Sequence, residues 1–296
     1  NVFLDVEGAG VNVGHPHHLY IGRENGDNGG LGPYNIDNSH DKWNETVEGL
    51  PVYVTVANNL MRKVCSVWWQ MSPITVYYGH HISVDHNDLK DTPYNSVTLG
   101  WGWSEWNGVP GPKKYHEASR KGLYPSRSQR FFTCNYNRIV NPYTILDDTG
   151  ALYFLADFAI PAEPPAPQTE YSEVIGNYIS ARNFKAGLLY TDEGASFLGF
   201  DSNVLDGPSG LNRICGRGKD SRNKLFTNNF LADRAEYKLG AMHDPGVVFT
   251  NNVFLKRTGD PLKLADWPQP AQEIVNRAGL EPAYRRLLEK LPADER

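Results

Sequence analysis

The sequence has no stretch approaching eighteen consecutive apolar residues, so none of its 296 residues are predicted to cross a membrane in a helix. It has only three cysteines, Cys65, Cys134 and Cys215, which allow at most one disulfide. Buried thiols in separate parts of the fold are expected. The chain also has no large excess of positive or negative charge, because its net charge is −5. Nucleic acid is therefore not expected as a partner.

Helical periodicity is missing from most of the chain as well. Short runs of β-branched and aromatic residues recur in its place, as in Tyr53-Val54-Thr55-Val56 and Val247-Val248-Phe249-Thr250. The 28 glycines, 20 prolines and 12% aromatic residues suit a protein of short strands and many turns. This pattern predicts an all-β fold.

An asparagine followed two residues later by an apolar residue recurs seven times. The last four asparagines, Asn177, Asn203, Asn229 and Asn252, are spaced by 26, 26 and 23 residues. A regular period of this size is typical of a solenoid, and strand-like repeats favour a right-handed parallel β-helix. Asn177, Asn203 and Asn229 are predicted to occupy equivalent turn positions. The seven instances are Asn58-Asn59-Leu60, Asn87-Asp88-Leu89, Asn137-Arg138-Ile139, Asn177-Tyr178-Ile179, Asn203-Val204-Leu205, Asn229-Phe230-Leu231 and Asn252-Val253-Phe254.

The two ends of the chain suggest its organisation. We expect residues 1–260 to form the parallel β-helix and residues 261–296 to form a helical cap against the last coils, with short helices over 271–278 and 281–291. Asn1-Val2-Phe3-Leu4-Asp5 resembles an internal turn of the repeat, so we expect the C-terminal part of a longer solenoid. An earlier segment or a partner chain is then expected to cover Val2, Leu4 and Val6. The sequon Asn44-Glu45-Thr46 is compatible with a secreted or extracytoplasmic protein.

Three segments combine carboxylates with aromatic residues. They span residues 91–103, 147–153 and 187–194, and each follows an asparagine turn by a similar interval. Their strands are therefore predicted to be neighbours in one sheet, with side chains on a common face. Aromatic rings that stack on sugars, beside acids that act at a glycosidic bond, are typical of a polysaccharide site.

These segments resemble a known family. Tyr94 followed by Gly100-Trp101-Gly102-Trp103, then Asp148-Thr149-Gly150-Ala151 and Tyr153, then Tyr190-Thr191-Asp192-Glu193-Gly194, is similar to the parallel β-helix proteins of glycoside hydrolase family 141. That family includes fucosidases and xylanases that act on plant cell-wall glycans. The resemblance covers roughly residues 50–290 and includes Trp-Pro and Gly-Leu-Glu-Pro-Ala-Tyr pieces at 267–284. Where relatives usually show Asp-Gly-Gly, this chain has Asp148-Thr149-Gly150.

The resemblance implies a catalytic pair of aspartates, placed on Asp192 and Asp148. If Gly150 aligns with Gly187, the two aspartates lie seven residues apart in register, or roughly 20 Å along extended strands. Asp157 is therefore kept as a reserve partner. Asp148 also suits a plain turn, and Asp192 and Glu193 also suit a bend beside Gly194. The expected substrate-binding residues are Trp101, Trp103, Glu193, Tyr153, Tyr190, Arg120 and Arg127.

The favoured function is a glycoside hydrolase that cleaves a plant-type or acidic polysaccharide with paired carboxylates, without a cofactor. No metal site is predicted, because nothing makes the histidines around His17 and His81 converge. The basic insertion at 113–130 keeps open a polysaccharide lyase, in which basic residues would neutralise a uronate. A glycan-binding or assembly subunit without catalysis is the third reading, since fold alone does not give function.

Overall fold

The computed structural model describes most of the predicted strand regions and the C-terminal segment. Every strand pairing among the described residues is parallel, and strands dominate up to residue 257. The prediction of an all-β protein with parallel sheets is confirmed. The described residues are 1–14, 51–77, 79–100, 129–155, 158, 171–182, 187–192, 195–207, 223–233, 246–257, 260–293 and 295.

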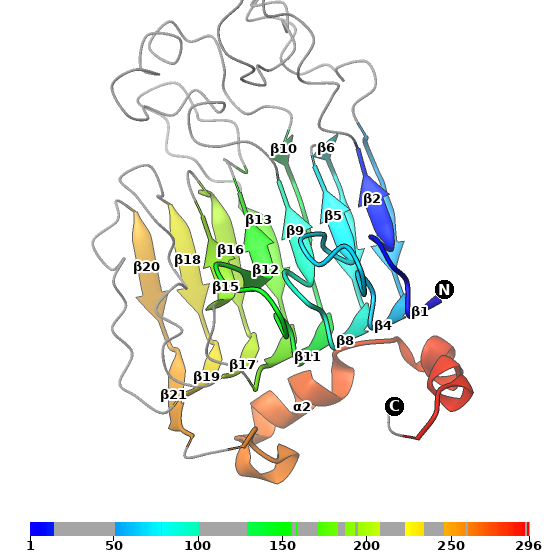
Figure 1. Ribbon diagram of the computed structural model, residues 1–296. Coiled ribbons are helices and arrows are strands. Elements are labelled where there is room, and N and C mark those ends of the chain that lie inside the picture. The colour runs from blue at the N-terminus through cyan, green and yellow to red at the C-terminus, as the bar shows by residue number, and fades with distance from the viewer. Residues whose placement is uncertain are drawn as a thin grey trace, which may run out of the picture.

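An eight-stranded sheet runs the length of the molecule (Figure 1). Its neighbouring strands are contributed by successive segments of the chain, in an order that never reverses. Its strands are, in order, β1 (Val2–Leu4), β4 (Leu60–Arg62), β8 (Asp88–Lys90), β11 (Arg138–Val140), β14 (Tyr178–Ser180), β17 (Val204–Asp206), β19 (Phe230–Asp233) and β21 (Val253–Lys256).

A five-stranded sheet forms a second layer. Between β9 and β17 the chain passes repeatedly from this layer to a third layer and then to the eight-stranded sheet. The five strands are β15 (Gly187–Thr191), β12 (Gly150–Phe154), β9 (Val97–Leu99), β5 (Ile74–Val76) and β2 (Val11–Val13).

The third layer is assembled from shorter pieces. Single bridges from Ser83 to Thr133 and from Thr133 to Glu173 join its two-stranded part to its four-stranded part. The two-stranded part is β3 (Thr55–Ala57) and β7 (Ser83–Asp85), and the four-stranded part is β13 (Ser172–Ile175), β16 (Leu198–Asp201), β18 (Lys224–Thr227) and β20 (Val247–Thr250). A further parallel pair consists of β6 (Gly79–His80) and β10 (Gln129–Arg130). These two strands shortly precede Ser83 and Thr133 of the third layer in the chain.

A row of asparagines, buried from Asn59 to Asn229, joins the third layer to the eight-stranded sheet. In each turn the side-chain amide nitrogen donates to the side-chain oxygen of the next asparagine, as from Asn177 to Asn203 at 2.9 Å and from Asn203 to Asn229 at 2.9 Å. The predicted equivalence of Asn177, Asn203 and Asn229 is confirmed. The row comprises Asn1, Asn59, Asn87, Asn137, Asn177, Asn203, Asn229 and Asn252.

One turn differs in detail from the predicted pattern. In Asn58-Asn59-Leu60 the second asparagine belongs to the row, while Asn58 has a φ of 56° and donates to Glu281 at 2.8 Å. The inward apolar residue of that turn is then Met61, which is in register with Phe3 and Leu89. The space between the layers is filled by such residues, including a stack of Phe200, Phe226 and Phe249 with ring centroids 4.7 Å apart.

Two of the cysteines are free and buried, as predicted. Cys65 and Cys134 are each fully buried, and burial raises the pKa of the Cys65 thiol to about 12. Such thiols are poor nucleophiles at neutral pH. Cys215 lies outside the described residues.

The C-terminal segment contains η4 (Leu264–Asp266), α2 (Gln269–Arg277) and η5 (Pro282–Lys290). The predicted helices therefore exist, but α2 begins two residues earlier than predicted and η5 has 3₁₀ geometry. Pro268 and Pro270 flank the start of α2, where a missing N–H costs no hydrogen bond. Gly279 ends the helix with a φ of 84°, and its N–H donates to the Tyr136 carbonyl at 2.7 Å.

This segment runs along the eight-stranded sheet and is not confined to its last strands (Figure 1). Trp267 and Ala271 pack against Val204 and Phe230, whereas Leu280 and Leu291 pack against Leu60 in β4. The expected position against the last repeats alone is corrected by these contacts. The physical reason is that the first strands also present apolar side chains, including Val2, which Leu280 and Leu291 can bury.

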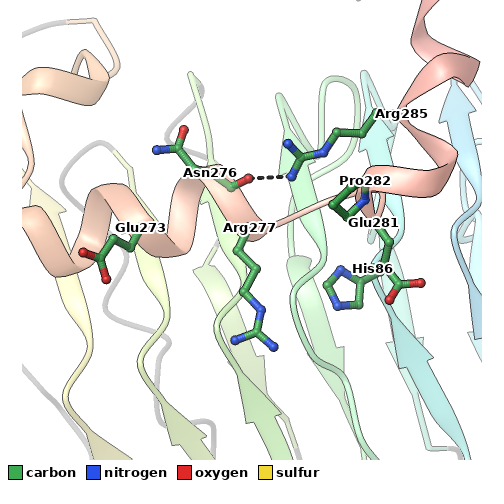
Figure 2. Close-up of a pocket in the computed structure, with 7 residues that line it drawn as sticks. All are labelled: His86, Glu273, Asn276, Arg277, Glu281, Pro282 and Arg285. Carbon is green, nitrogen blue, oxygen red and sulfur yellow. Dashed lines mark hydrogen bonds between the residues drawn. The ribbon is translucent and has the colours of Figure 1, made fainter.

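Polar contacts fix both parts of the segment. Arg277 lies 3.8 Å over the ring of Tyr136, and the Arg285 side chain donates to the Asn276 carbonyl at 2.7 Å. A hollow of about 510 Å³ lies here, lined by His86, Glu273, Asn276, Arg277, Glu281, Pro282 and Arg285 (Figure 2). Both guanidinium groups are engaged in holding the bend between α2 and η5.

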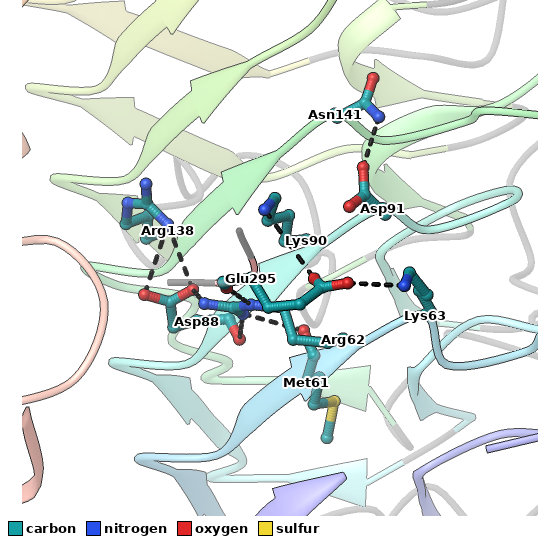
Figure 3. A network of polar contacts seen from close by, with 9 residues as sticks. All are labelled: Met61, Arg62, Lys63, Asp88, Lys90, Asp91, Arg138, Asn141 and Glu295. Carbon is teal, nitrogen blue, oxygen red and sulfur yellow. Dashed lines mark hydrogen bonds and ion pairs between the residues drawn. The ribbon is translucent and has the colours of Figure 1, made fainter. Parts of the chain in front are cut away.

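Charged residues hold the last residues of the chain to the first strands (Figure 3). Asp88 accepts ion pairs from Arg62 at 2.8 Å and from Arg138 at 3.3 Å. The Arg62 side chain also donates to the carbonyl of Glu295 at 2.8 Å, and Lys63 lies 2.6 Å from the Glu295 carboxylate.

No helix in the described part of the chain is both long and apolar enough to cross a membrane.

Arg257 connects β21 to the C-terminal segment through a buried ion pair. It lies 3.2 Å from Asp206, whose other oxygen accepts the Leu262 N–H at 2.9 Å. Burial raises the pKa of Asp206 to about 6, although Arg257 and the Leu262 N–H oppose that shift. Because the folded pKa exceeds the unfolded value, this group lowers stability as the pH rises from about 4 to about 6.

Replacing Arg257 with Met should lower the unfolding free energy by about 3 kcal/mol at neutral pH, because Asp206 loses its buried cation. The loss should be smaller at pH 5 than at pH 8, because protonation removes the uncompensated charge. Urea unfolding of both proteins at several pH values measures this difference. A loss independent of pH would contradict the assigned role of Asp206.

Candidate functional site

The three segments that combine acids with aromatic residues lie together. Their strands β9, β12 and β15 are consecutive in the five-stranded sheet, as predicted. Gly150 is in register with Gly187, as the sequence alignment of the two strands supposed. Tyr153 is consequently in register with both Tyr190 and Thr98.

Tyr153 and Tyr190 form the centre of the site. Their ring centroids are 5.2 Å apart with an interplanar angle of 88°, an edge-to-face arrangement. Gly150 permits this geometry, because a Cβ there would meet the Tyr190 Cβ at 2.5 Å. The lack of a side chain at Gly150 therefore leaves the space that Tyr190 occupies beside Tyr153.

Each phenol reaches one of the predicted catalytic aspartates. The Tyr153 hydroxyl donates to Asp192 Oδ2 at 2.5 Å, and the Tyr190 hydroxyl lies 3.3 Å from Asp148 Oδ1. Asp148 is exposed and Asp192 is partly exposed, so both carboxylates are accessible to a ligand. We call Asp148, Asp192, Tyr94, Tyr153 and Tyr190 the tyrosine-bridged site.

Tyr94 lies near both acids. Its hydroxyl donates to the Asp148 carbonyl at 3.1 Å. Burial, then Asp148, then Asp192 raise the pKa of the Tyr94 phenol. Burial and the neighbouring Asp192 likewise raise the pKa of Tyr153 well above its ordinary value. Both phenols therefore remain protonated donors at neutral pH.

The side chain of Asn95 fixes the turn that carries Asp148. Its oxygen accepts hydrogen bonds from the Thr149 hydroxyl and, at 3.0 Å, from the Gly150 N–H. The Asn95 amide donates to Thr98 at 3.1 Å. Asp148 itself has a φ of 56°. The Thr149 hydroxyl thus makes a hydrogen bond that a glycine at this position would lack.

The register that separates the two aspartates along their strands is the one expected from the sequence. They do lie at opposite ends of neighbouring strands, but the long tyrosine side chains between them reach both ends. Sequence reasoning missed Tyr94 and Asn95 as site residues. The tyrosine that begins the Tyr-to-Gly-Trp-Gly-Trp motif was the available signal for Tyr94.

Four of the predicted site residues, Asp148, Asp192, Tyr153 and Tyr190, are brought together. Among the described residues, no group of three or more histidines, cysteines and acids is arranged to hold a metal ion. The remaining predicted residues lie outside the described part of the chain; they are Trp101, Trp103, Arg120, Arg127, Asp157 and Glu193.

One solved structure shares this fold. It is named "Glycoside hydrolase" and superimposes with a TM-score of 0.54 over 96% of this chain, at 20% sequence identity. The chain spans about a third of its length, since 34% of that structure is covered. No protein-family model matches the chain, and no curated protein sequence matches it. At this identity the likeness concerns the fold, and activity has to be argued from the site.

Proposed function

We propose that the chain is a glycoside hydrolase, or the site-bearing part of one, built on a right-handed parallel β-helix. Its three layers would be the faces of the helix, and the asparagine row would mark one of its turns. The likeness to family 141 and the solved glycoside hydrolase of similar fold support the class of enzyme. The substrate class would be a plant-type or acidic polysaccharide outside the cell.

The observation that carries the proposal is the pair of accessible carboxylates in the tyrosine-bridged site. In glycoside hydrolysis, one carboxyl group protonates the leaving oxygen while the other attacks the anomeric carbon or activates water. Tyr153 would orient Asp192 and Tyr190 would orient Asp148. The ring of Tyr153, partly exposed between them, would contact the sugar.

The same site disfavours elimination by a lyase. A lyase of this kind would need a base such as a tyrosinate next to a uronate. Tyr94 and Tyr153 have raised pKa values because they are buried beside acids, so both phenols stay protonated and a tyrosinate base would be scarce.

Product analysis tests the reaction class. The protein is incubated with xylan, fucosylated xyloglucan and polygalacturonate, and products are followed by reducing-end release and by absorbance of unsaturated uronates. We expect new reducing ends without ultraviolet absorbance from at least one glycan. Unsaturated products would establish the lyase, and the absence of both signals together with retained glycan binding would favour a non-catalytic subunit.

A further inference from the structure

A column of aromatic residues lies on the third layer, apart from the tyrosine-bridged site. Tyr53, His81 and Phe131 occupy equivalent positions in successive segments, two residues before Thr55, Ser83 and Thr133. The ring centroids of Tyr53 and His81 are 4.7 Å apart, as are those of His81 and Phe131, and both pairs are tilted by 34°. The rings thus form a continuous platform.

This platform borders a groove of about 450 Å³. The groove is wide enough for part of an oligosaccharide, because small-molecule sites span about 300–1,000 Å³. Tyr53 is 76% exposed, although an aromatic ring of this size gains from burial. The lining residues are Tyr53, Thr55, His81, Ser83, Phe131, Phe132, Thr133, Tyr171 and Glu173.

The three residues of the platform have a backbone conformation that is unfavourable for side chains of their size. Tyr53, His81 and Phe131 have φ values of 57°, 55° and 53°, in the left-handed region. Glycine and asparagine fill that region with less strain than bulky aromatic residues. Asn58, Asn228 and Asn251 serve this chain elsewhere at φ 56°. The equivalent turn of later segments has the same conformation at Asn223 and Gly246, with φ values of 47° and 73°, so the conformation belongs to the fold. The use of aromatic residues in place of asparagine or glycine at this turn is what points to a ligand.

Polar groups run beside the rings. Thr55, Ser83, Thr133 and Glu173 form a row in register across four neighbouring segments. In the described part of the chain, the hydroxyl of Thr133 is engaged with Asp85, whereas those of Thr55 and Ser83 remain available. An aromatic surface with adjacent hydroxyls matches a sugar ring, which has apolar faces and hydroxyl edges.

The charge of the groove narrows the class of ligand. Its described lining includes Glu173 and neither lysine nor arginine, and the Arg130 guanidinium lies 5.3 Å from the centroid of the Phe131 ring. A uronate, a phosphate or a nucleic acid in the groove would meet the Glu173 carboxylate. A neutral glycan avoids this cost.

We propose that this groove is a second carbohydrate-binding site, which holds a neutral glycan chain without cleaving it. The site would keep a polymer attached while another part of it occupies the tyrosine-bridged site, so the proposal extends the proposed function. Two linked sites bind one long polymer more tightly than either site alone. An oligosaccharide that occupies one site alone gains nothing from this linkage.

Affinity electrophoresis tests the site in the full chain carrying Asp192→Asn, with xylan, xyloglucan, β-1,4-galactan and polygalacturonate in the gel. We expect retardation by at least one neutral polymer, and at least tenfold weaker retention when Tyr53→Ala is added. Tyr53 is so exposed that its removal should not affect folding. Tyr284→Ala is the matched control, because Tyr284 is 45% exposed on η5.

Three results would overturn the proposal: no retardation by any neutral polymer, equal retention with and without Tyr53→Ala, or tighter retention by polygalacturonate than by every neutral polymer. Turnover of a trisaccharide by the chain with Asp192 intact separates this site from the catalytic one. Tyr53→Ala should leave that turnover unchanged. If hydrolysis is absent while Tyr53→Ala still weakens polymer binding, the groove stands and the hydrolase proposal fails.

Discussion

Asp192→Asn should reduce hydrolysis at least about 1,000-fold while glycan binding persists. A catalytic carboxylate acts mainly on the transition state, so its loss lowers kcat more than it weakens binding. A 1,000-fold loss corresponds to about 4 kcal/mol of transition-state stabilisation. Asparagine preserves the shape of the side chain and still accepts the Tyr153 hydrogen bond, so the fold should be unchanged.

Asp147→Asn is the matched control for this experiment. Asp147 is an exposed neighbour of Asp148 and is not part of the tyrosine-bridged site. Reducing-end assays on all purified variants should show near-normal turnover for Asp147→Asn and a large loss for Asp148→Asn. Near-normal kcat in Asp192→Asn would refute its catalytic assignment. Normal turnover in Asp148→Asn alone would make Asp157 the better candidate for the partner.

The stacking of parallel strands was predictable because each repeat has an asparagine at the same turn, where it makes the same hydrogen bonds. Each buried asparagine satisfies a neighbouring asparagine and a backbone carbonyl, so the spacing of asparagines maps directly onto adjacent strands. In the Asn58-Asn59 turn the sequence pattern assigned Asn58 to the row, whereas Asn59 occupies it. Both residues satisfy the pattern, and only the burial of Asn59 distinguishes them. The course of the C-terminal segment was not predictable, since periodicity identifies its apolar side but not the surface it covers.

The sequence predicted which neighbouring strands carry Tyr153 and Tyr190, but not how these side chains meet Asp192 and Asp148. The equivalence of Gly150 and Gly187 followed from the repeat, and it placed Tyr153 beside Tyr190. Register alone, however, measures backbone separation, whereas the phenols of these residues extend far from their strands toward Asp192 and Asp148. The aromatic groove was missed because a tyrosine, a histidine and a phenylalanine form no obvious motif, although Tyr53, His81 and Phe131 each lie six residues before an asparagine of the row.

Asn203→Ala should lower the unfolding free energy by roughly 4 kcal/mol, a large effect for the loss of one polar side chain. The Asn203 side chain accepts from the N–H of Asn177 at 3.0 Å and from the Asn177 amide at 2.9 Å. It donates to Val174 at 2.8 Å and to Asn229 at 2.9 Å. Alanine leaves these buried partners without hydrogen bonds, and each such group costs about 1–3 kcal/mol.

Asn251→Ala separates this effect from the general cost of removing a turn asparagine. Asn251 is exposed and precedes the row at a φ of 56°, so its replacement should cost only about 1 kcal/mol of left-handed backbone strain. Urea unfolding monitored by circular dichroism provides both values. Equal losses in the two variants would show that backbone conformation, and not the row of hydrogen bonds, determines stability at these turns. A much larger loss in Asn203→Ala would establish that the row holds successive segments in register, and with them the strands that align Tyr153 with Tyr190.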